Sequence, residues 1–412
     1  MSRSKVLFQI SGSIAAYKSA GIISKLVQSG YEVQTVATTS AFKFIGAATL
    51  EGLTGKPVLT DMFAPGQLMD HINLIKWADL VILAPATANT LNRLAQGLAD
   101  DLIGALFLAH DWQKPYLIAP AMNTKMYTHP ATQKSLNTLR EWGVKILPTA
   151  EGYLACGDEG QGKMLEPDLI LEAISEATPH TDEAIKVLIT SGGTGENIDS
   201  VRYISNMSTG QTGSNLADTL IREGYSVTFL HSEMSNSPDL VCQRIPYVSS
   251  QDLDKALNEQ LSSRYYDVII HLAAVSDYLP VQIETGATPI DLPFDGKVSS
   301  DSERLTLSFT RNIKLLDKIR SYSLNPEIQI VAFKLTSGST VEQQIEAVEQ
   351  LFKQANCDIV VANDMDHRPD NRQTHFQVFS RSDLAAPDTA FSSTDLANLL
   401  TKIISQKKGR SS

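Results

Sequence analysis

Two short runs of small residues could each hold a phosphate group. The first is Ser11-Gly-Ser-Ile-Ala-Ala16 and the second is Ser191-Gly-Gly-Thr-Gly195, and each directly follows an apolar run. Between a strand and a helix, such a turn brings backbone N–H groups to a phosphate with no side chain in the way. Two of these turns, about 180 residues apart, predict two α/β domains that each hold a phosphorylated ligand.

Neither turn has the G-x-G-x-x-G fingerprint of dinucleotide-binding folds. Gly12 lacks a glycine two residues on, and Ile198 stands where the second turn would need a small residue. After the second strand of each half, where an acidic residue is expected, the chain has Thr38-Thr-Ser40 and His231-Ser232. Hydroxyl groups suit a phosphate monoester better than an adenosine ribose, which favours FMN over NAD. A two-domain NAD-dependent oxidoreductase remains an alternative at this point.

Three side chains of the first half could form one reactive site. His71 precedes a buried strand, although a histidine in such a place is more often structural. Asn123 follows another apolar run, at the strand edge where ligands of α/β sheets collect, and its alternative role is a cap for the next helix. Cys156 lies within an eleven-residue stretch that holds four glycines, which indicates a flap, whereas a lone cysteine is usually a small buried hydrophobic residue.

Strands and helices must alternate along the chain to position these residues. The first half has strand-like runs at 6–10, 33–38, 80–85, 116–119 and 145–147, and helical patterns at 15–29, 87–94 and 130–142. After a polar linker, strand-like runs return at 186–190, 226–231, 268–274, 328–333 and 358–362. This alternation predicts two doubly wound, mostly parallel α/β domains, at residues 1–178 and 185–405.

Residues 278–302 interrupt the second half with a stretch rich in Pro, Gly, Asp and Ser. We expect a long mobile loop there, and a loop of that length inside a compact domain is usually functional.

The composition of the 412 residues excludes several functional classes. The net charge of −11 argues against non-specific binding to nucleic acid. The apolar runs are too short to cross a bilayer, and no signal peptide is evident. Three widely spaced cysteines, an odd number, predict reduced thiols in the cytoplasm. The second half is the more acidic one, so an anionic substrate there would need a local basic pocket, a metal ion, or both.

Several motifs together resemble a known family. In the first half, Gly12-Ser-Ile-Ala-Ala-Tyr-Lys18, the run from Trp77 to Asn89, Pro120-Ala-Met-Asn123 and Ala155-Cys-Gly157 resemble the flavin-dependent cysteine decarboxylases. In the second half, Gly192-Gly-Thr, the run from Ile198 to Asn206, Ala273-Ala-Val-Ser-Asp-Tyr278 and Val361-Ala-Asn-Asp364 resemble phosphopantothenate–cysteine ligase. In this order the halves resemble the bifunctional family of bacterial coenzyme A biosynthesis, which implies a flavodoxin-like flavoprotein domain followed by a Rossmann-like ligase domain.

The resemblance implies a decarboxylase in the first half, with FMN as its cofactor. In this family the flavin oxidises the thiol-bearing carbon to a thioaldehyde, which serves as the electron sink for loss of CO₂. The implied flavin-binding residues are Gly12, Ser13, Ser40, Thr87 and Asn89. His71 would act as the base, Asn123 would hold the substrate carboxylate through its amide, and Cys156 would return a proton.

For the second half the resemblance implies a ligase that uses CTP to activate phosphopantothenate as an acyl-cytidylate, which the amine of cysteine then attacks. Gly192, Gly193 and Thr194 would cradle phosphate, Asn206 would contact the acyl-cytidylate, and Arg202 is expected one helical turn before Asn206. Lys297 would lie on a lid that closes over the site. The further implied contacts are Asp277, Phe333 and Lys334, with Mg²⁺ as a cofactor and Asp277 as its candidate ligand. Without the resemblance, Arg202 reads equally well as a surface salt bridge and Lys297 as a solvated charge.

The chain also departs from the family pattern. Lys163 stands where arginine is expected, Asn197 replaces a proline, Gln211 replaces a lysine, and Ser300 stands where relatives often have a second lid lysine. These changes bear on recognition of the acidic substrate and on the charge of the lid.

The family's assembly further implies a homo-oligomer, with trimeric flavin domains and dimeric ligase domains. The remaining alternative is a flavin-binding regulatory homologue that lacks one or both activities.

Overall fold

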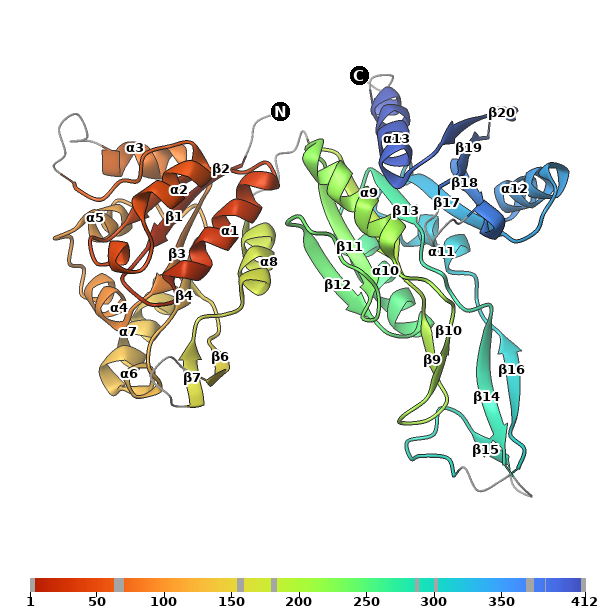
Figure 1. Ribbon diagram of the computed structural model, residues 1–412, viewed down its shortest axis with the longest axis horizontal. Coiled ribbons are helices and arrows are strands. Elements are labelled where there is room, and N and C mark those ends of the chain that lie inside the picture. Colours follow the sequence, from red (N-terminus) through yellow and green to blue (C-terminus); the bar gives the residue numbers. More distant parts are fainter. Residues whose placement is uncertain are drawn as a thin grey trace. The chain divides into compact units, whose positions relative to one another are not determined.

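A computed structural model of the chain describes residues 4–62, 70–153, 159–178, 184–285, 289–299, 303–367, 374–381 and 383–408 (Figure 1). Its contacts divide the chain into two units, Met1–Glu183 and Ala184–Ser412. Cys156 and Ser300 lie outside the described residues. Among the helices of the described part of the chain, none is long and apolar enough to cross a membrane.

Unit 1 is built on a five-stranded sheet with the order β2-β1-β3-β4-β5, in which all neighbours are parallel. The strands are β1 (Lys5–Ile10), β2 (Glu32–Ala37), β3 (Leu80–Ala86), β4 (Tyr116–Pro120) and β5 (Lys145–Ile146). Every residue of β3 is buried, as expected for a strand that is covered on both faces. The order is that of flavodoxin-like folds, which confirms the predicted fold class.

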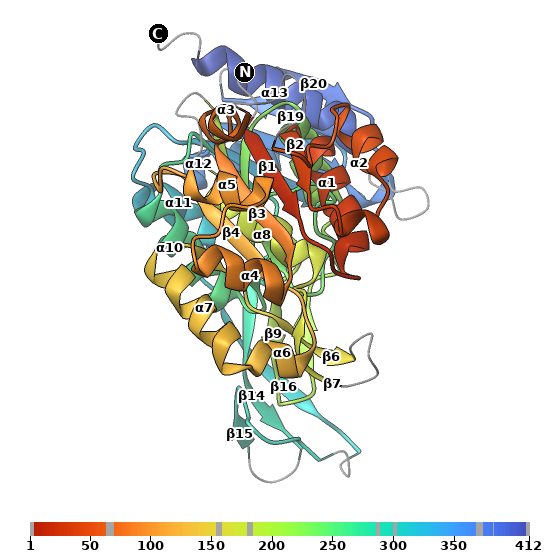
Figure 2. The same cartoon turned by 90° about the vertical axis from the view of Figure 1, so that its left-hand side faces the viewer.

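The helices of unit 1 flank this sheet (Figure 1). They are α1 (Ala16–Gln28), α2 (Ala47–Thr54), α3 (Asp70–Trp77), α4 (Ala88–Ala95), α5 (Leu102–Leu108), α6 (Thr124–Thr128), α7 (Pro130–Glu141) and α8 (Pro167–Ala177). Helix α1 packs against α2 and α8, whereas α4 packs against α7, and these last two lie side by side in Figure 2. A separate antiparallel hairpin, β6 (Ala150–Tyr153) and β7 (Glu159–Lys163), follows β5.

Unit 2 has an eight-stranded sheet with the order β12-β11-β8-β13-β17-β18-β19-β20. The parallel strands are β8 (Lys186–Ser191), β11 (Ser226–Ser232), β12 (Gln243–Tyr247), β13 (Val268–His271), β17 (Gln329–Thr336) and β18 (Ile359–Asp364). Two antiparallel strands, β19 (Phe376–Ser380) and β20 (Asp383–Ala390), complete one edge. The sheet is therefore mostly parallel, as predicted.

Helices again cover the sheet of unit 2, and two apolar clusters form its core. The helices are α9 (Gln211–Arg222), α10 (Ser250–Ser263), α11 (Leu315–Tyr322), α12 (Val341–Ala355) and α13 (Ser393–Lys408). Helices α10 and α12 are both preceded by a capping box, in which the side chain of the residue before the helix, Ser249 or Thr340, accepts the backbone N–H of the third helical residue, whose side chain accepts the N–H of the capping residue.

The prediction of one long mobile loop at 278–302 is wrong. Three antiparallel strands, β14 (Tyr278–Glu284), β15 (Pro289–Asp291) and β16 (Thr306–Arg311), form a small sheet with the order β15-β14-β16, which extends from one end of the large sheet of unit 2 (Figure 1). Its own core contains Ile198, Ile283 and Val298. Two prolines lie within these strands, Pro280 in β14 and Pro289 at the start of β15, and proline is uncommon in strands, so the sequence did not indicate them.

The second small-residue turn does not lead into a helix, contrary to the prediction. It continues into a hairpin of β9 (Gly195–Asn197) and β10 (Tyr203–Ser205), and α9 begins only at Gln211. Arg202 therefore precedes a strand and does not lie one helical turn before Asn206. The first turn behaves as predicted, because α1 begins at Ala16.

Candidate functional sites

The turn after β1 lies against the segment that follows β2. Gly12 has no room for a side chain, because a Cβ built on it would stand 2.4 Å from Oγ of Ser40. The same Oγ lies 3.0 Å from Oγ1 of Thr38. Ser13 lies in this turn, and its Oγ accepts the N–H of Ala15 at 3.3 Å. The turn thus brings backbone N–H groups near the hydroxyl groups that follow β2, a combination that suits a phosphate monoester.

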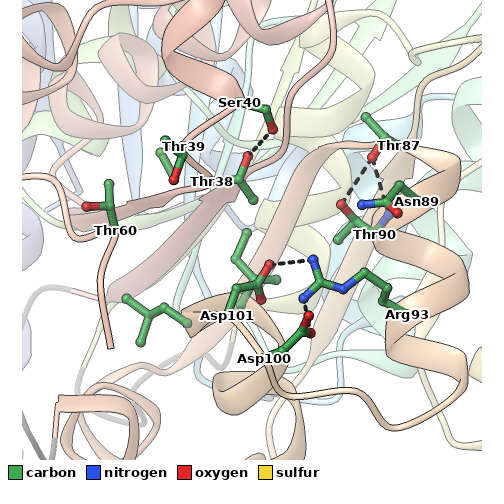
Figure 3. Close-up of a pocket in the computed structure, with 13 residues that line it drawn as sticks. Thr38, Thr39, Ser40, Thr60, Thr87, Asn89, Thr90, Arg93, Asp100 and Asp101 are labelled. Atoms are coloured by element: carbon green, nitrogen blue, oxygen red, sulfur yellow. Dashed lines mark hydrogen bonds and ion pairs between the residues drawn. The ribbon is translucent and has the colours of Figure 1, made fainter. Parts of the chain in front are cut away.

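A cleft of about 350 Å³ opens beside Ser40 (Figure 3). Its walls are the segment after β2, the start of α4 and the start of α5. Three of the residues expected to bind flavin line it, namely Ser40, Thr87 and Asn89. Further hydroxyl groups come from Thr38, Thr39, Thr60 and Thr90. Such a lining suits a ligand that carries hydroxyl and phosphate groups.

Ser11 joins the turn after β1 to the turn after β3. Its hydroxyl donates to the carbonyl oxygen of Pro85 at 2.7 Å and accepts the N–H of Thr87 at 2.9 Å. Thr87 in turn caps α4, because its Oγ1 accepts the N–H of Thr90. Ser11 belongs to the small-residue turn that the sequence indicated, but we did not expect a role for its side chain, which is buried.

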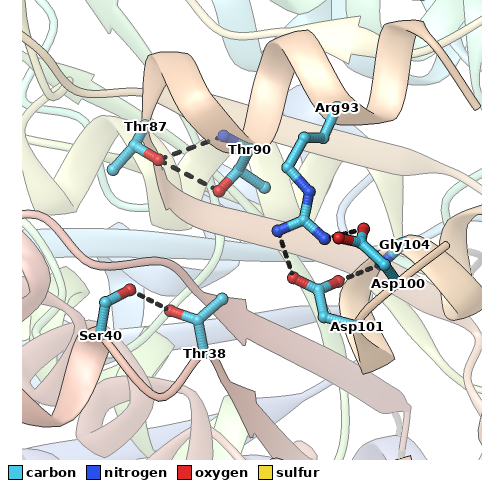
Figure 4. Close-up of polar contacts among 8 residues, drawn as sticks. All are labelled: Thr38, Ser40, Thr87, Thr90, Arg93, Asp100, Asp101 and Gly104. Atoms are coloured by element: carbon cyan, nitrogen blue, oxygen red, sulfur yellow. Dashed lines mark hydrogen bonds and ion pairs between the residues drawn. The ribbon is translucent and has the colours of Figure 1, made fainter. Parts of the chain in front are cut away.

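An ion-pair cluster closes the far side of the cleft (Figure 4). The guanidinium group of Arg93 bonds Asp101 at 3.0 Å and also bonds Asp100. The bond from Arg93 holds the pKa of the Asp100 carboxyl below its usual value. Asp101 also caps α5, since its Oδ1 accepts the N–H of Gly104 at 2.8 Å. Two carboxylates thus neutralise the arginine, and the hydroxyl side of the cleft is the better place for a phosphate.

His71 lies near the start of α3 and does not line the cleft. Its ring nitrogen Nδ1 is buried and has no hydrogen-bond partner among the described residues. Because most buried polar atoms are paired, an unpaired ring nitrogen fits a group that awaits a ligand.

Asn123 caps α6, and it lies where the β6–β7 hairpin docks. Its Oδ1 accepts the N–H of Lys125 at 2.8 Å, which is the capping role that we considered as the alternative. On either side of it, the N–H of Met122 donates to the carbonyl oxygen of Gly162 at 2.9 Å, and Oγ1 of Thr124 donates to that of Gln161 at 2.7 Å. The β6–β7 hairpin is therefore fixed to the segment that carries Asn123.

In unit 2, Gly192 and Gly193 allow two segments to approach the carboxyl end of β8. Gly192 has a φ of 97°, and a Cβ on it would stand 2.7 Å from side-chain atoms of Ser232 and Ser235. A Cβ on Gly193 would stand 2.7 Å from the carbonyl oxygen of Asn206. Only glycine fits both places without displacing its neighbours.

Asn206 and Thr194 tie this turn to the segment after β13. The side-chain amide of Asn206 donates to the carbonyl oxygen of Ala274 at 3.1 Å. The hydroxyl of Thr194 accepts the N–H of Ser276 at 3.1 Å and is fully buried, so it is engaged within the protein. The N–H of Ala274 donates to the carbonyl oxygen of Gly192 at 2.8 Å.

Asp277, the candidate metal ligand, forms an ion pair with Lys314. Among the described residues, no group of three or more His, Cys, Asp or Glu side chains is placed to hold a metal ion. The residues that the structure describes therefore do not form a magnesium site of their own.

Phe333 and Lys334 lie on β17, next to β13 in the sheet. Both are half-buried, and Phe333 packs on the core. The carboxylate of Asp364 orders the loop that follows β17, because it accepts the N–H groups of Gly338 and Ser339 and the hydroxyl of Thr336. The N–H of Asp366 also donates to this carboxylate at 3.0 Å, and this bond, followed by the hydroxyl of Thr336, lowers the pKa of Asp364 to about 2.

Arg202 pairs with Asp199, whose side chain is fully buried. The guanidinium group contacts Oδ2 of Asp199 at 2.6 and 3.0 Å and donates to the carbonyl oxygen of Val298 at 2.9 Å. The side-chain bond from Arg202 holds the pKa of the Asp199 carboxyl far below its usual range. Lys297, next to Val298, is exposed.

The structure brings some of the candidate residues of each unit together at the carboxyl edge of its parallel sheet. In unit 1 it brings together Gly12, Ser40, Thr87 and Asn89, but His71 and Asn123 do not line the same cleft. In unit 2 it brings together Gly192, Gly193, Thr194 and Asn206. Sequence reasoning missed Arg93, Asp101 and Asp199, whose only signal was an acidic residue a few positions from an arginine.

Comparisons with known proteins assign each of the two units to a protein family. The family model described as Flavoprotein matches residues 1–178, and the one described as DNA/pantothenate metabolism flavoprotein C-terminal domain matches residues 183–407. The coenzyme A biosynthesis bifunctional protein CoaBC of Vibrio vulnificus is 37% identical over 366 residues, which cover 88% of this chain and 86% of that protein. The CoaBC proteins of Bacillus subtilis and Mycobacterium tuberculosis are each 35% identical; both alignments cover 87% of this chain, with 86% and 85% of those proteins. This chain belongs to the family of coenzyme A biosynthesis bifunctional proteins.

Proposed function

We propose that the chain catalyses two successive reactions of coenzyme A biosynthesis, one in each unit. Unit 2 would ligate cysteine to phosphopantothenate, and unit 1 would decarboxylate the resulting phosphopantothenoylcysteine to phosphopantetheine. The observation that carries this proposal is that a flavoprotein model matches unit 1 and a pantothenate-metabolism model matches unit 2, while each unit has its own cluster of motif residues.

The fit of unit 1 to FMN rests on the crowded contact of Gly12 with Ser40 and on the hydroxyl-lined cleft beside it. We assign Gly12, Ser13, Ser40, Thr87 and Asn89 to that cofactor. Bound FMN would supply the hydride acceptor and donor that decarboxylation of a cysteinyl carboxylate needs.

The protein side chains would handle the substrate and its protons. The carbonyl oxygen of the Asn123 side chain caps α6, and its amide would hold the substrate carboxylate, as the family resemblance implies. Nδ1 of His71 would accept the proton that leaves the substrate, because that atom has no partner among the described residues. Cys156 would return a proton after CO₂ departs; this role rests on the family resemblance, since the residue lies outside the described part.

In unit 2 a carboxylate oxygen of phosphopantothenate would attack the α-phosphorus of CTP and release pyrophosphate. The amine of cysteine would then attack the acyl carbon and release CMP, with the amine proton passing to solvent. Asn206, held beside Gly193, and the glycine turn would contact the nucleotide. Lys297 would neutralise charge on the transferring group. Further contacts to the nucleotide or substrate are predicted from the sequence for Arg202, Asp277, Phe333 and Lys334. Mg²⁺ is predicted to bind the triphosphate, and we assign no reaction step to it.

The assembly and location of the chain are part of the proposal. Exposed apolar side chains near the start of α1, Ile14 and Tyr17, support a homo-oligomer of the flavin unit. Trimeric flavin units, dimeric ligase units and a cytoplasmic location remain predictions from the sequence.

A single-turnover reaction tests the whole proposal. The full chain would be mixed with phosphopantothenate, cysteine, CTP and Mg²⁺, analysed by mass spectrometry, and its flavin spectrum recorded. We expect CMP and phosphopantetheine together with a flavin spectrum. Accumulation of phosphopantothenoylcysteine even after FMN is added would instead support a regulatory flavin unit, and absence of CMP would refute the ligase.

A further inference from the structure

Asp199 makes an unusual number of contacts for one buried carboxylate. Its Oδ1 accepts the N–H groups of Val201 at 2.9 Å and Arg202 at 2.7 Å. Its Oδ2 accepts two bonds from the guanidinium group of Arg202 and the N–H of Val298 at 3.1 Å. A buried carboxylate is tolerated only when it is paired and hydrogen-bonded in this way, so the arrangement has one favoured geometry.

These bonds hold the chain on both sides of Lys297. On one side, the carbonyl oxygen of Gly296 accepts the N–H and the hydroxyl of Ser200, each at 3.2 Å. On the other side, the N–H of Val298 donates to Asp199 and its carbonyl oxygen accepts from Arg202. The side chain of Val298 is buried in the small core, whereas Lys297 itself is exposed. A lysine expected on a free loop thus has a firmly held backbone.

The same hairpin leads to the candidate ligase site. Asp199 and Arg202 lie in the turn between β9 and β10, and β10 runs directly into Asn206. Asn206 is fixed against Gly193 and Ala274. One hairpin therefore carries both the anchor of Lys297 and the asparagine of the site, which sets the position of each relative to the other.

We propose that Asp199 is a positioning residue for the ligation reaction, holding Lys297 in place relative to Asn206. This inference rests on the proposed role of Lys297 in unit 2. A cation contributes most to transfer of a charged group when its position is fixed before the reaction. The buried carboxylate would supply that fixed position, and Arg202 would act with it.

The Asp199→Asn variant tests the anchor without any assay of activity. Asparagine keeps the shape of the side chain but loses the charge that binds Arg202. The full chain of each variant would be digested with trypsin, which cleaves after Lys297. We expect the fragment ending at Lys297 to be released at least roughly ten times faster than from the wild type, because local opening becomes more frequent. Asp218→Asn is the matched control: Asp218 is buried and accepts the N–H groups of Asp239 and Leu240, away from this hairpin. An unchanged release rate in Asp199→Asn, or an equal increase in the control, would overturn the anchor.

A double-mutant cycle with Lys297→Gln tests whether Asp199 acts through the lysine. Asp199→Asn alone should slow CMP formation roughly 10- to 100-fold. In the Lys297→Gln background, Asp199→Asn should slow CMP formation little further, since the lysine that Asp199 positions is already absent. Independent, multiplying losses would refute the positioning role. If the wild type forms no CMP, the proposed function fails while the trypsin result still decides the anchor.

Hydrogen exchange on the wild type covers the case in which Asp199→Asn does not fold. The N–H of Val298 should be strongly protected, because it donates to a buried carboxylate. Exchange of this amide at the rate of an unstructured chain would overturn the proposal.

Discussion

At the scale of single residues, small hydroxyl side chains connect segments that are distant in sequence. Ser11 joins the turns after β1 and β3, and Thr194 joins the turn after β8 to Ser276. Such bonds satisfy buried polar groups and fix the turns relative to one another. Residues of a motif can thus matter for a site without touching its ligand.

Gly12 offers the most direct test of the flavin site. In Gly12→Ala the new Cβ would stand 2.4 Å from Oγ and 2.6 Å from Cβ of Ser40, so the turn or the serine must move. We expect purified protein to retain less than about one-tenth of the wild-type flavin, measured by absorbance, because backbone contacts to a phosphate need close approach of the turn. The ligation activity should be unchanged.

Gly21→Ala is the matched control, because Gly21 lies inside α1 with no atom within 4 Å of a built Cβ. It should keep its flavin and gain about 0.5–1 kcal/mol in the free energy of unfolding. Full flavin content in Gly12→Ala would contradict the assigned site.

At the scale of elements, two hairpins that no strand–helix alternation predicts carry candidate site residues. The β9–β10 hairpin separates the glycine turn from α9, and the β6–β7 hairpin docks beside Asn123. The alternating runs identified the parallel strands except β12, because buried strands form continuous apolar segments whereas most residues of β12 are not fully buried. The short hairpins could not be predicted from the sequence, because their strands have only three to five residues and depend on partners elsewhere in the chain. For the same reason the contact of Asp199 with Val298, 99 residues away, could not be predicted.

Docking of the β6–β7 hairpin is predicted to control decarboxylation. Gly162 has a φ of 115°, and a Cβ on it would stand 2.5 Å from the carbonyl oxygen of Met122. Gly162→Ala should therefore displace the hairpin from Asn123 and lower the rate of CO₂ release about tenfold or more. The bound flavin and the ligation rate should be unaffected.

Gly152→Ala separates this clash from backbone strain. Gly152 lies on the partner strand with a φ of 138°, so alanine there has a comparable strain of about 1–2 kcal/mol. No atom lies within 4 Å of its built Cβ. Equal loss of CO₂ release in both variants would assign the effect to strain and would refute docking.

At the scale of the whole molecule, His271 should make the stability of unit 2 depend on pH. Its ring is buried with Nδ1 2.8 Å from Oγ1 of Thr190, and burial lowers its pKa to about 4. The unfolded chain, with a histidine pKa of about 6.5, binds the proton more readily. The contribution of neutral His271 to the free energy of unfolding should therefore be fully present above about pH 6.5. The free energy of unfolding should fall by up to about 3 kcal/mol as the pH drops to about 4.

Urea unfolding of the full chain at several pH values between 4 and 7 would measure this effect. His110 and His231 also have lowered pKa values because of burial, so the difference between the wild type and His271→Gln isolates His271. The variant should lose less stability on acidification than the wild type. The same dependence on pH in both proteins would contradict the prediction.

The central claim is that one chain holds two separable reactions, and a crossed pair of variants tests it most directly. His71→Asn and Lys297→Gln would each be given phosphopantothenate, cysteine and CTP with Mg²⁺, or phosphopantothenoylcysteine alone, and the products would be identified by mass spectrometry. We predict that His71→Asn releases CMP at the wild-type rate and accumulates phosphopantothenoylcysteine. Lys297→Gln should release little CMP yet decarboxylate supplied phosphopantothenoylcysteine normally. Loss of both reactions in either variant, with its fold intact by circular dichroism, would contradict the division of function between the two units.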